Sequence, residues 1–224
     1  VFMKRTLTSE VNAHAGERVR VMGWLHSLRQ LGGLNFLVIR DGWGLVQAIA
    51  EREEEIAPLL ENKLSVESVI AVEGLVVNEA QAPGGAELHD LSIEIITPIK
   101  EAPAISLNKR KISANISTLL DQAVVVNRHP TRRAIFSLAA GMLGSFRNTL
   151  NTQGFTEIQT PKIVAAATES GANAFKLDYF GRPAYLAQSP QFYKQIMVGV
   201  FERVFEVGPV FRAEPHDTTR HLNE

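Results

Sequence analysis

Polar and apolar side chains alternate along much of the first hundred residues, in short runs separated by glycine. The clearest run, residues 18–26, places Val19, Val21 and Leu25 at alternating positions, which is the period of a half-buried β-strand. Short apolar or alternating runs predict four further strands, at residues 34–40, 45–50, 69–77 and 88–96. A short helix is predicted between the third and fourth strands, at residues 53–64.

Three strands, a helix and two strands follow one another in the order of a five-stranded Greek-key β-barrel of the OB type. Such barrels present one face and its loops to oligonucleotides. An exposed Phe36, beside Arg29 and Gln47, would suit stacking on a base and hydrogen bonding to its edge. Phe36 lies in a strongly apolar strand, however, so the pattern alone leaves open that its ring belongs to the barrel core.

A linker follows the barrel. Residues 97–103 combine two prolines with charged side chains and show no apolar period. We therefore predict an N-terminal domain at residues 1–102, a hinge at 103–130 with a short helix near 117–125, and a second domain at 131–224.

The second domain is predicted to open with a long amphipathic helix at residues 131–154, where apolar residues recur at helical spacing. Thr131 is a candidate N-cap and Gly154 a candidate C′ residue. The next strand ends at Pro161, which cannot continue a β-ladder and suits a sheet edge or an interface. The apolar stripe of the helix is compatible with a dimer and also with burial inside one chain.

Another helix is predicted to begin with Ser189 as N-cap and Pro190 at its first position. Gln191 and Lys194 are three residues apart and therefore share one face of this helix. An ammonium group there could hold a carboxylate or a phosphate. An ordinary surface lysine is an equally good interpretation of the spacing.

The last stretch, residues 203–224, begins as a strand that bends at Gly208-Pro209 and then becomes densely polar. Arg212 and Arg220 flank a turn on this strand. Guanidinium groups bind phosphate bidentately and stay charged, so the pair suits a triphosphate. The alternative is a solvated hairpin tip.

Composition narrows the possible functions. The 224 residues include no cysteine, which excludes disulfides, thiolate zinc sites and a cysteine nucleophile and suits the reducing cytoplasm. The net charge of −1 does not indicate nucleic-acid binding by itself. No apolar run reaches the roughly 18 residues of a membrane span, so no membrane partner is expected.

The later segments resemble a known family. Phe211-Arg212-Ala213-Glu214 resembles motif 2 of class II aminoacyl-tRNA synthetases, and the helix at 131–154 with the strand ending at Pro161 resembles their motif 1. Segments 188–195, 212–214 and 218–224 are similar to archaeal-type aspartyl-tRNA synthetases, which some bacteria also carry. The resemblance covers essentially the whole chain. It implies an α+β multidomain fold, with an OB-fold barrel followed by the first part of a class II antiparallel-sheet catalytic domain.

The resemblance implies that L-aspartate attacks the α-phosphate of ATP and that the aspartyl group then passes to tRNA, chemistry that depends on positioning and charge neutralisation. It gives Arg212 the catalytic contacts to the α-phosphate and the substrate carboxylate. The aspartate would be held by Glu169 at its amino group and by Gln191 and Lys194 at its side chain. The remaining ATP contacts are implied for Glu214, Arg220, His221 and Leu222.

Lys194 is the argument for aspartate as the substrate. An ammonium group attracts the side-chain carboxylate of aspartate, whereas the neutral side-chain amide of asparagine would meet an unfavourable partner there. The related asparaginyl-tRNA synthetases are therefore the alternative.

In the barrel, the resemblance assigns the central anticodon base to Phe36 and Gln47, with Arg29 near them. His26 stands where strictly aspartate-specific enzymes tend to have tryptophan. Together with Pro83, it implies the non-discriminating kind of enzyme. Such an enzyme charges tRNA(Asp) and also tRNA(Asn), whose anticodons share two bases and differ as C versus U at the third.

The family's motif 3 and its acidic Mg²⁺ ligands are expected beyond residue 224, with no metal ligand within this chain. The chain alone is therefore expected to show no ATP–pyrophosphate exchange. The family also implies a homodimer with Pro161 at the interface. A tRNA-binding fragment without chemistry is a further alternative. So is a relative that makes free asparagine, although such relatives lack the barrel.

Overall fold

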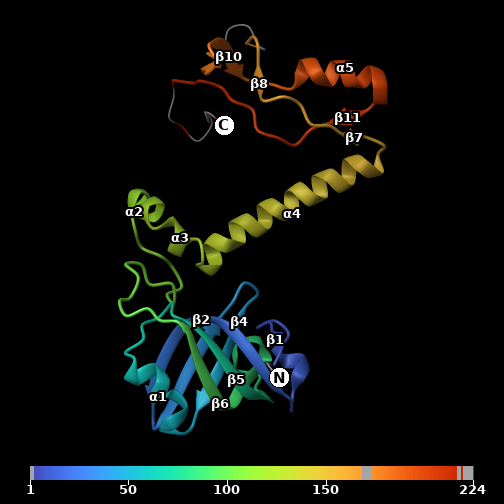
Figure 1. Cartoon of the computed structure of the whole chain (residues 1–224). Helices are drawn as coiled ribbons and strands as arrows, with labels where there is room; N and C mark the ends of the chain where they lie inside the picture. The colour runs from blue at the N-terminus through green and yellow to red at the C-terminus, as the bar shows by residue number, and fades with distance from the viewer. Residues whose placement is uncertain (1–2, 168–172, 216–217, 219–223) are drawn as a thin grey trace. The chain divides into compact units, whose positions relative to one another are not determined.

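The computed structural model describes residues 3–167, 173–215, 218 and 224. It divides into two compact units, Val1–Ala134 and Ile135–Glu224 (Figure 1). Each unit is described by itself below. The domain boundaries expected near residues 102 and 130 stay a prediction.

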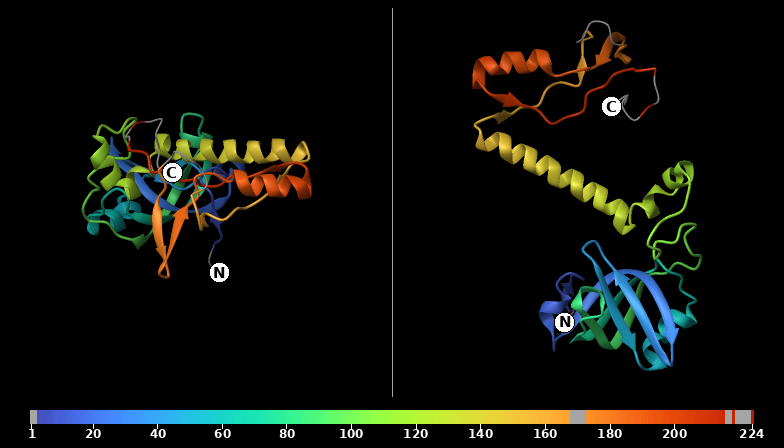
Figure 2. Two further views of the ribbon diagram at one scale, coloured as in Figure 1. Left: turned by 90° about the horizontal axis from the view of Figure 1, so that it is seen from above. Right: turned by 180° about the vertical axis from the view of Figure 1, so that it is seen from behind.

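The first unit is a closed β-barrel. Its strands are β2 (Arg18–Leu31), β3 (Leu34–Arg40), β4 (Leu45–Ala50), β5 (Val69–Asn78) and β6 (Ala86–Thr97). They are hydrogen-bonded in the order β2-β3-β4-β6-β5, and β5 also pairs with β2, which closes the barrel (Figure 2). Only β4 and β6 run parallel within this ring. The five predicted strands are thus confirmed, and β2 continues five residues beyond the predicted end.

Short elements accompany the barrel strands. Helix α1 (Glu53–Glu61) lies between β4 and β5, as predicted. A two-residue strand, β1 (Arg5–Thr6), pairs with β2 in parallel, and single 3₁₀ turns occur at η1 (Val11–His14) and η2 (Pro83–Gly85).

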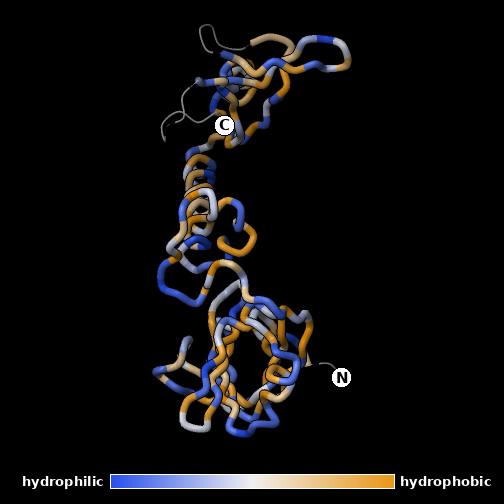
Figure 3. Tube along the Cα trace, turned by 90° about the vertical axis from the view of Figure 1, so that its left-hand side faces the viewer, coloured by the Kyte–Doolittle hydropathy of each residue, from blue (hydrophilic) through white to orange (hydrophobic). Residues whose placement is uncertain are grey.

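The barrel core follows from the alternating pattern, which is visible along the strands in Figure 3. Inward positions are fully buried and apolar, for example Val21, Leu25, Leu37, Ile39 and Ile70. Outward positions on the same strands remain half-buried or exposed. Because side chains alternate along a strand, the outward side chains form a surface on the outside of the barrel, separate from its core.

The predicted hinge helix is divided in two, α2 (Ile116–Asp121) and α3 (Ala123–Val126). The Asn115 side chain caps α2 by accepting a hydrogen bond from the backbone N–H of Thr118, at 2.8 Å. The backbone leaves helical geometry at Gln122, where φ is −102° and ψ is 21°. Helix resumes at Ala123, directly after this residue.

Helix α4 (Pro130–Thr152) confirms the predicted long helix but begins one residue earlier. Thr131 is therefore not the N-cap. Pro130 occupies the first turn, where its missing N–H costs nothing, and the Thr131 N–H donates to Nδ1 of His129 at 3.3 Å. Gly154 ends the helix as expected: its φ is +78°.

The second unit contains short strands: β7 (Thr156–Glu157), β8 (Ile163–Val164), β9 (Lys176–Tyr179), β10 (Arg182–Leu186) and β11 (Val204–Phe205). β8, β10 and β9 form an antiparallel sheet in that order, in which β9 and β10 make a hairpin (Figure 2). β7 and β11 pair in parallel. The rings of Phe146 in α4 and Phe205 in β11 meet edge to face, with centroids 6.0 Å apart.

Two predictions for this unit need correction. The strand expected at residues 155–161 is only two residues long, because the Thr160 N–H donates to the Glu206 carboxylate instead of a ladder. Helix α5 (Gln191–Phe201) begins with Pro190 at the cap position and no side-chain cap, so Ser189 is not its N-cap. No helix of the described residues is long and apolar enough to cross a membrane.

Candidate nucleic-acid interface and candidate nucleotide site

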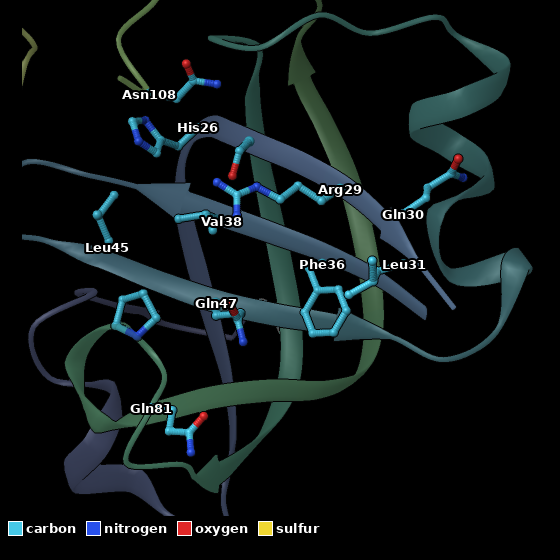
Figure 4. Close-up of a pocket in the computed structure, with 12 residues that line it drawn as sticks. His26, Arg29, Gln30, Leu31, Phe36, Val38, Leu45, Gln47, Gln81 and Asn108 are labelled. Carbon is cyan, nitrogen blue, oxygen red and sulfur yellow. The ribbon is translucent and has the colours of Figure 1, made fainter. Parts of the chain in front are cut away.

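The outer face of the barrel carries a pocket of about 670 Å³ (Figure 4). Strands β2, β3 and β4 supply most of its lining, and the loop that contains η2 supplies the opposite side. All five barrel residues singled out from the sequence line this one pocket: His26, Arg29, Phe36, Gln47 and Pro83. The sequence reasoning missed Asn108 and Gln81, which also line it. Both lie in irregular segments, where no periodic pattern marks a direction.

Strand register places Phe36 in the pocket. Phe36 pairs with Arg29 across β2–β3, and Val38 pairs with Gln47 across β3–β4. Paired residues project from the same face of a sheet. Phe36 is half-buried and does not belong to the core cluster, so its ring lines the pocket (Figure 4). Such a ring offers a stacking surface for a planar ligand.

His26 lies at an irregularity of β2. Leu25 pairs with Ile39 and Ser27 pairs with Val38, so the register shifts by one and leaves His26 without a partner in β3. A bulge of this kind redirects side chains. Gly23, three residues earlier, is required because a Cβ there would clash with the carbonyl group of Arg40.

A charged residue behind the pocket holds the His26 ring. Nη1 of Arg40 lies 2.8 Å from Nδ1 of His26. Burial, and after it the positive charge of Arg40, lowers the pKa of His26 below its ordinary value of 6.5. The ring is therefore neutral at physiological pH.

Gln47 is held by a carboxylate. Its Nε2 donates to Oε2 of Glu87 at 3.0 Å, and the other oxygen of Glu87 lies 2.9 Å from Nε2 of His89. A carboxylate only accepts hydrogen bonds, so the amide nitrogen of Gln47 must face Glu87. The amide oxygen remains as an acceptor for a ligand.

In the second unit, Gln191 lies in the first turn of α5 and Lys194 in its second. Gln191 is exposed and Lys194 is half-buried. The backbone N–H of Lys194 donates to the carbonyl of Pro190 at 3.0 Å, which continues the helix. The two side chains lie on one face, as the spacing predicts.

Arg212 and Glu214 lie on a segment that runs beside two others. The Phe211 N–H donates to the carbonyl of Ala187 at 2.9 Å, and the Ala187 N–H donates to that of Lys162 at 2.9 Å. Arg212 is exposed and Glu214 is half-buried. Four further predicted residues lie outside the described residues: Glu169, Arg220, His221 and Leu222.

A buried carboxylate near Pro161 was not predicted. Glu206 accepts from Nζ of Lys162 at 2.7 Å, and from the N–H and hydroxyl of Thr160 at 3.0 and 2.8 Å. Burial acts to raise the pKa of Glu206, but these hydrogen bonds outweigh it and hold the pKa below its usual value. A charge inside the apolar run 204–207 was the available signal. Pro161 is exposed.

No group of three or more His, Asp or Glu side chains that could hold a metal ion occurs among the residues that the structure describes.

Comparison with known proteins covers both units. The family described as tRNA synthetases class II (D, K and N) matches residues 115–224, and the OB-fold nucleic acid binding domain matches residues 19–96. The chain is 48% identical to an aspartate–tRNA(Asp/Asn) ligase of Deinococcus radiodurans, over 99% of this chain and 49% of that protein. It is 45% identical to the protein of the same name from Thermus thermophilus, over 98% of this chain and 50% of that protein.

Among solved structures, asparaginyl-tRNA synthetase from Pyrococcus horikoshii in complex with asparaginyl-adenylate is similar with a TM-score of 0.88 and 35% identity. The match covers 99% of this chain and 51% of that one. The chain thus spans about half the length of the curated relatives that it matches.

Proposed function

Because the chain combines an OB-fold nucleic acid binding domain with part of a class II tRNA synthetase domain of the D, K and N group, we propose that the whole protein is an aspartate–tRNA ligase. The observation that carries this proposal is the 48% identity, along 99% of the chain, to a relative named aspartate–tRNA(Asp/Asn) ligase. The proposal comprises ATP-dependent formation of aspartyl-adenylate and transfer of the aspartyl group to tRNA.

The chemistry that these residues would perform is positioning and charge neutralisation. Attack of the aspartate carboxylate on the α-phosphate of ATP brings two anions together, so cations must hold both. We assign that role to Arg212, because a guanidinium group can bind a phosphate and a carboxylate and this residue is exposed. Glu214 is assigned to ATP, together with Arg220, His221 and Leu222. The family implies Mg²⁺, but the described residues assemble no metal site, and no step is assigned to it.

The substrate side chain is assigned to α5. Lys194 would pair with the side-chain carboxylate of aspartate, Gln191 would donate a hydrogen bond beside it, and Glu169 would receive the amino group. The half-buried position of Lys194 supports this assignment, because partial removal from water strengthens an ion pair. An asparagine amide would gain much less from this ammonium group.

Asparagine activation is the second candidate, and it is supported by the structural similarity to an asparaginyl-tRNA synthetase at a TM-score of 0.88. Two observations favour aspartate: identity is higher to the ligases named for aspartate, and α5 carries a lysine. A tRNA-binding protein without chemistry is a third candidate, which the same experiment tests.

The experiment is ATP–pyrophosphate exchange by the whole protein with aspartate or asparagine. We predict exchange with aspartate alone. Lys194→Met should reduce exchange with aspartate by about 100-fold, since a lost ion pair in a desolvated site costs about 3 kcal/mol. Lys176→Met, which removes an exposed lysine of β9, is the matched control and should leave the rate unchanged. Exchange with asparagine, or none with either, would refute the proposal.

The tRNA partners follow from the pocket on the barrel. We assign the central anticodon base to Phe36 and Gln47, with Arg29 beside them. The loop containing Pro83, with His26 across the pocket, is assigned to the third base. A neutral histidine at this place supports use of both tRNA(Asp) and tRNA(Asn), as the names of the relatives suggest.

We further propose a homodimer through α4 and Pro161. The exposed apolar side chains of α4 support this, with Leu138 69% and Met142 73% exposed in the single chain. Sedimentation analysis of the whole protein tests it, and a monomer at micromolar concentration would contradict it.

A further inference from the structure

The pocket residue His26 depends on a side chain that does not itself line the pocket. The Arg40 side chain is only 3% exposed, and it contacts His26 from behind the pocket, at 2.8 Å from Nδ1. Within the described residues, Nε2 of His26 has no protein partner. The contact between Arg40 and His26 decides whether the His26 ring presents a hydrogen-bond donor or an acceptor to a ligand in the pocket.

Arg40 is fixed from several sides. Its Nη2 donates to Oε2 of Glu67 at 2.7 Å, and the Glu67 side chain is also only 3% exposed. The guanidinium group lies over the Trp24 ring, 5.3 Å from its centre. Arg128 contacts the same two partners, at 3.3 Å from Glu67 and 5.0 Å from the ring centre. Arg40 therefore has little freedom to move away from His26.

The chemistry of arginine then determines the tautomer of His26. A guanidinium group carries five N–H donors and no acceptor. The nitrogen that faces it must therefore accept a hydrogen bond and cannot carry a proton. A neutral ring whose Nδ1 is an acceptor has its single proton on Nε2.

We propose that Arg40 is a positioning residue that holds His26 as a neutral ring whose Nε2–H is directed to the ligand. The pocket thus offers a hydrogen-bond donor at this place, and neither an acceptor nor a cation. This inference rests on the proposed function where it names the ligand, which is a pyrimidine base of single-stranded RNA. The acceptor that a fixed donor can meet on either pyrimidine is O2, because cytosine and uracil share it and differ at positions 3 and 4.

The charged and titratable groups around His26 support the neutral ring. Burial and Arg40 lower its pKa most, Glu67 opposes them, and His129 and Arg29 lower it further. His129 is itself engaged, since its Nε2 lies 2.8 Å from the carbonyl of Lys109. Removing the charge of Arg40 would leave Glu67 to raise the pKa of His26.

The test needs no RNA in its first arm. Long-range ¹H–¹⁵N spectra of the histidine rings in the full chain, assigned with His26→Gln, report the tautomer and the titration midpoint. We expect the Nε2–H tautomer and a midpoint below 6.5. Arg40→Gln should shift the midpoint upward and admit the Nδ1–H form, because glutamine can also accept. Arg40→Lys, which can only donate, should restore the wild-type spectrum.

One matched control makes the result decisive. Arg20→Gln removes a paired arginine from a different strand, β2, where it binds Glu73 and Glu94, and should leave His26 unchanged. If Arg40→Gln does not fold, the wild-type spectrum still tests the predicted Nε2–H tautomer of His26. An Nδ1–H tautomer there, or an unchanged midpoint in a folded Arg40→Gln variant, overturns the inference.

The second arm measures binding of anticodon stem–loops with C, U or 2-pyrimidinone at the third anticodon position. 2-Pyrimidinone keeps O2 and lacks the group at position 4, so we expect all three to bind within about threefold. Arg40→Gln should weaken all three by about fivefold, the effect of one misdirected hydrogen bond of about 1 kcal/mol. Tenfold weaker binding of the 2-pyrimidinone loop would refute O2 as the acceptor. If the wild type bound no stem–loop, the proposed function would fail and the ligand assignment with it, whereas the first arm would still decide the role of Arg40.

Discussion

At the scale of single residues, the barrel pocket separates side chains that would touch a ligand from those that hold them in place. Phe36 and Gln47 line the pocket. Glu87 and Arg40 lie behind it and form hydrogen bonds to Gln47 and His26, respectively. Each of these charged partners has only donors or only acceptors. It therefore fixes which atom of an ambivalent side chain is left for a ligand.

Phe36 provides the most direct prediction at this scale. Phe36→Ala should weaken binding of an anticodon stem–loop by about 5- to 150-fold, because stacking of one base on an aromatic ring contributes about 1–3 kcal/mol. Isothermal titration calorimetry with the 224-residue chain is the measurement.

Trp43 supplies the control for this measurement. It is an exposed aromatic residue of the barrel unit that does not line the pocket, with 56% of its surface accessible. Trp43→Ala should bind as the wild type does. Equal losses in the two variants would mean that general apolar surface binds the RNA, and the assignment of Phe36 would be abandoned.

At the scale of elements, Gly154 shows how one position ends the longest helix. The Phe155 N–H donates to the carbonyl of Leu150 at 3.0 Å, and the Gly154 N–H donates to that of Asn151 at 3.1 Å. This pair of hydrogen bonds is the Schellman motif, which needs a left-handed residue at C′. Gly154 has that conformation, with φ of +78°.

Gly154→Ala should therefore lower the free energy of unfolding by about 1–2 kcal/mol, the cost of a left-handed conformation for a residue with a Cβ. Gly141→Ala in the same helix should raise it by about 0.5–1 kcal/mol, because Gly141 has open space around its Cβ position and alanine favours helix. Urea unfolding followed by circular dichroism at 222 nm compares the two variants. Changes of the same sign would contradict this account of the helix end.

Elements with a strong local period could be predicted from the sequence. The five barrel strands and α4 are examples, since apolar residues recur along each of them at the spacing of a strand or a helix. The bulge at His26 could not be predicted, because it depends on how β2 pairs with β3. The shortened strand β7 and the link from Thr160 to Glu206 likewise depend on a contact between residues 46 positions apart.

The same distinction applies to the candidate sites. The residue types in the barrel, together with a family resemblance, indicated five residues that the structure brings into one pocket. Their supporting partners Arg40 and Glu87 were missed, because each looks like an ordinary strand residue in the sequence. Lys194 was placed correctly on a helix, but the N-cap of that helix was not, because Pro190 occupies the cap position.

At the scale of the whole molecule, the proposal assigns a different function to each of the two units. The barrel unit would identify the tRNA by its anticodon, and the second unit carries part of the site that would activate the amino acid. The chain spans about half the length of its curated relatives. The proposal therefore concerns the whole protein, and its central claim is that one enzyme attaches aspartate to two tRNAs.

Aminoacylation by the whole protein tests that claim most directly. Initial rates would be measured with radiolabelled aspartate or asparagine on purified tRNA(Asp) and tRNA(Asn) transcripts. The account predicts that aspartate is attached to both tRNAs at rates within about tenfold of each other, and that asparagine is attached to neither. Attachment of asparagine to tRNA(Asn), or of aspartate to tRNA(Asp) alone, would contradict it.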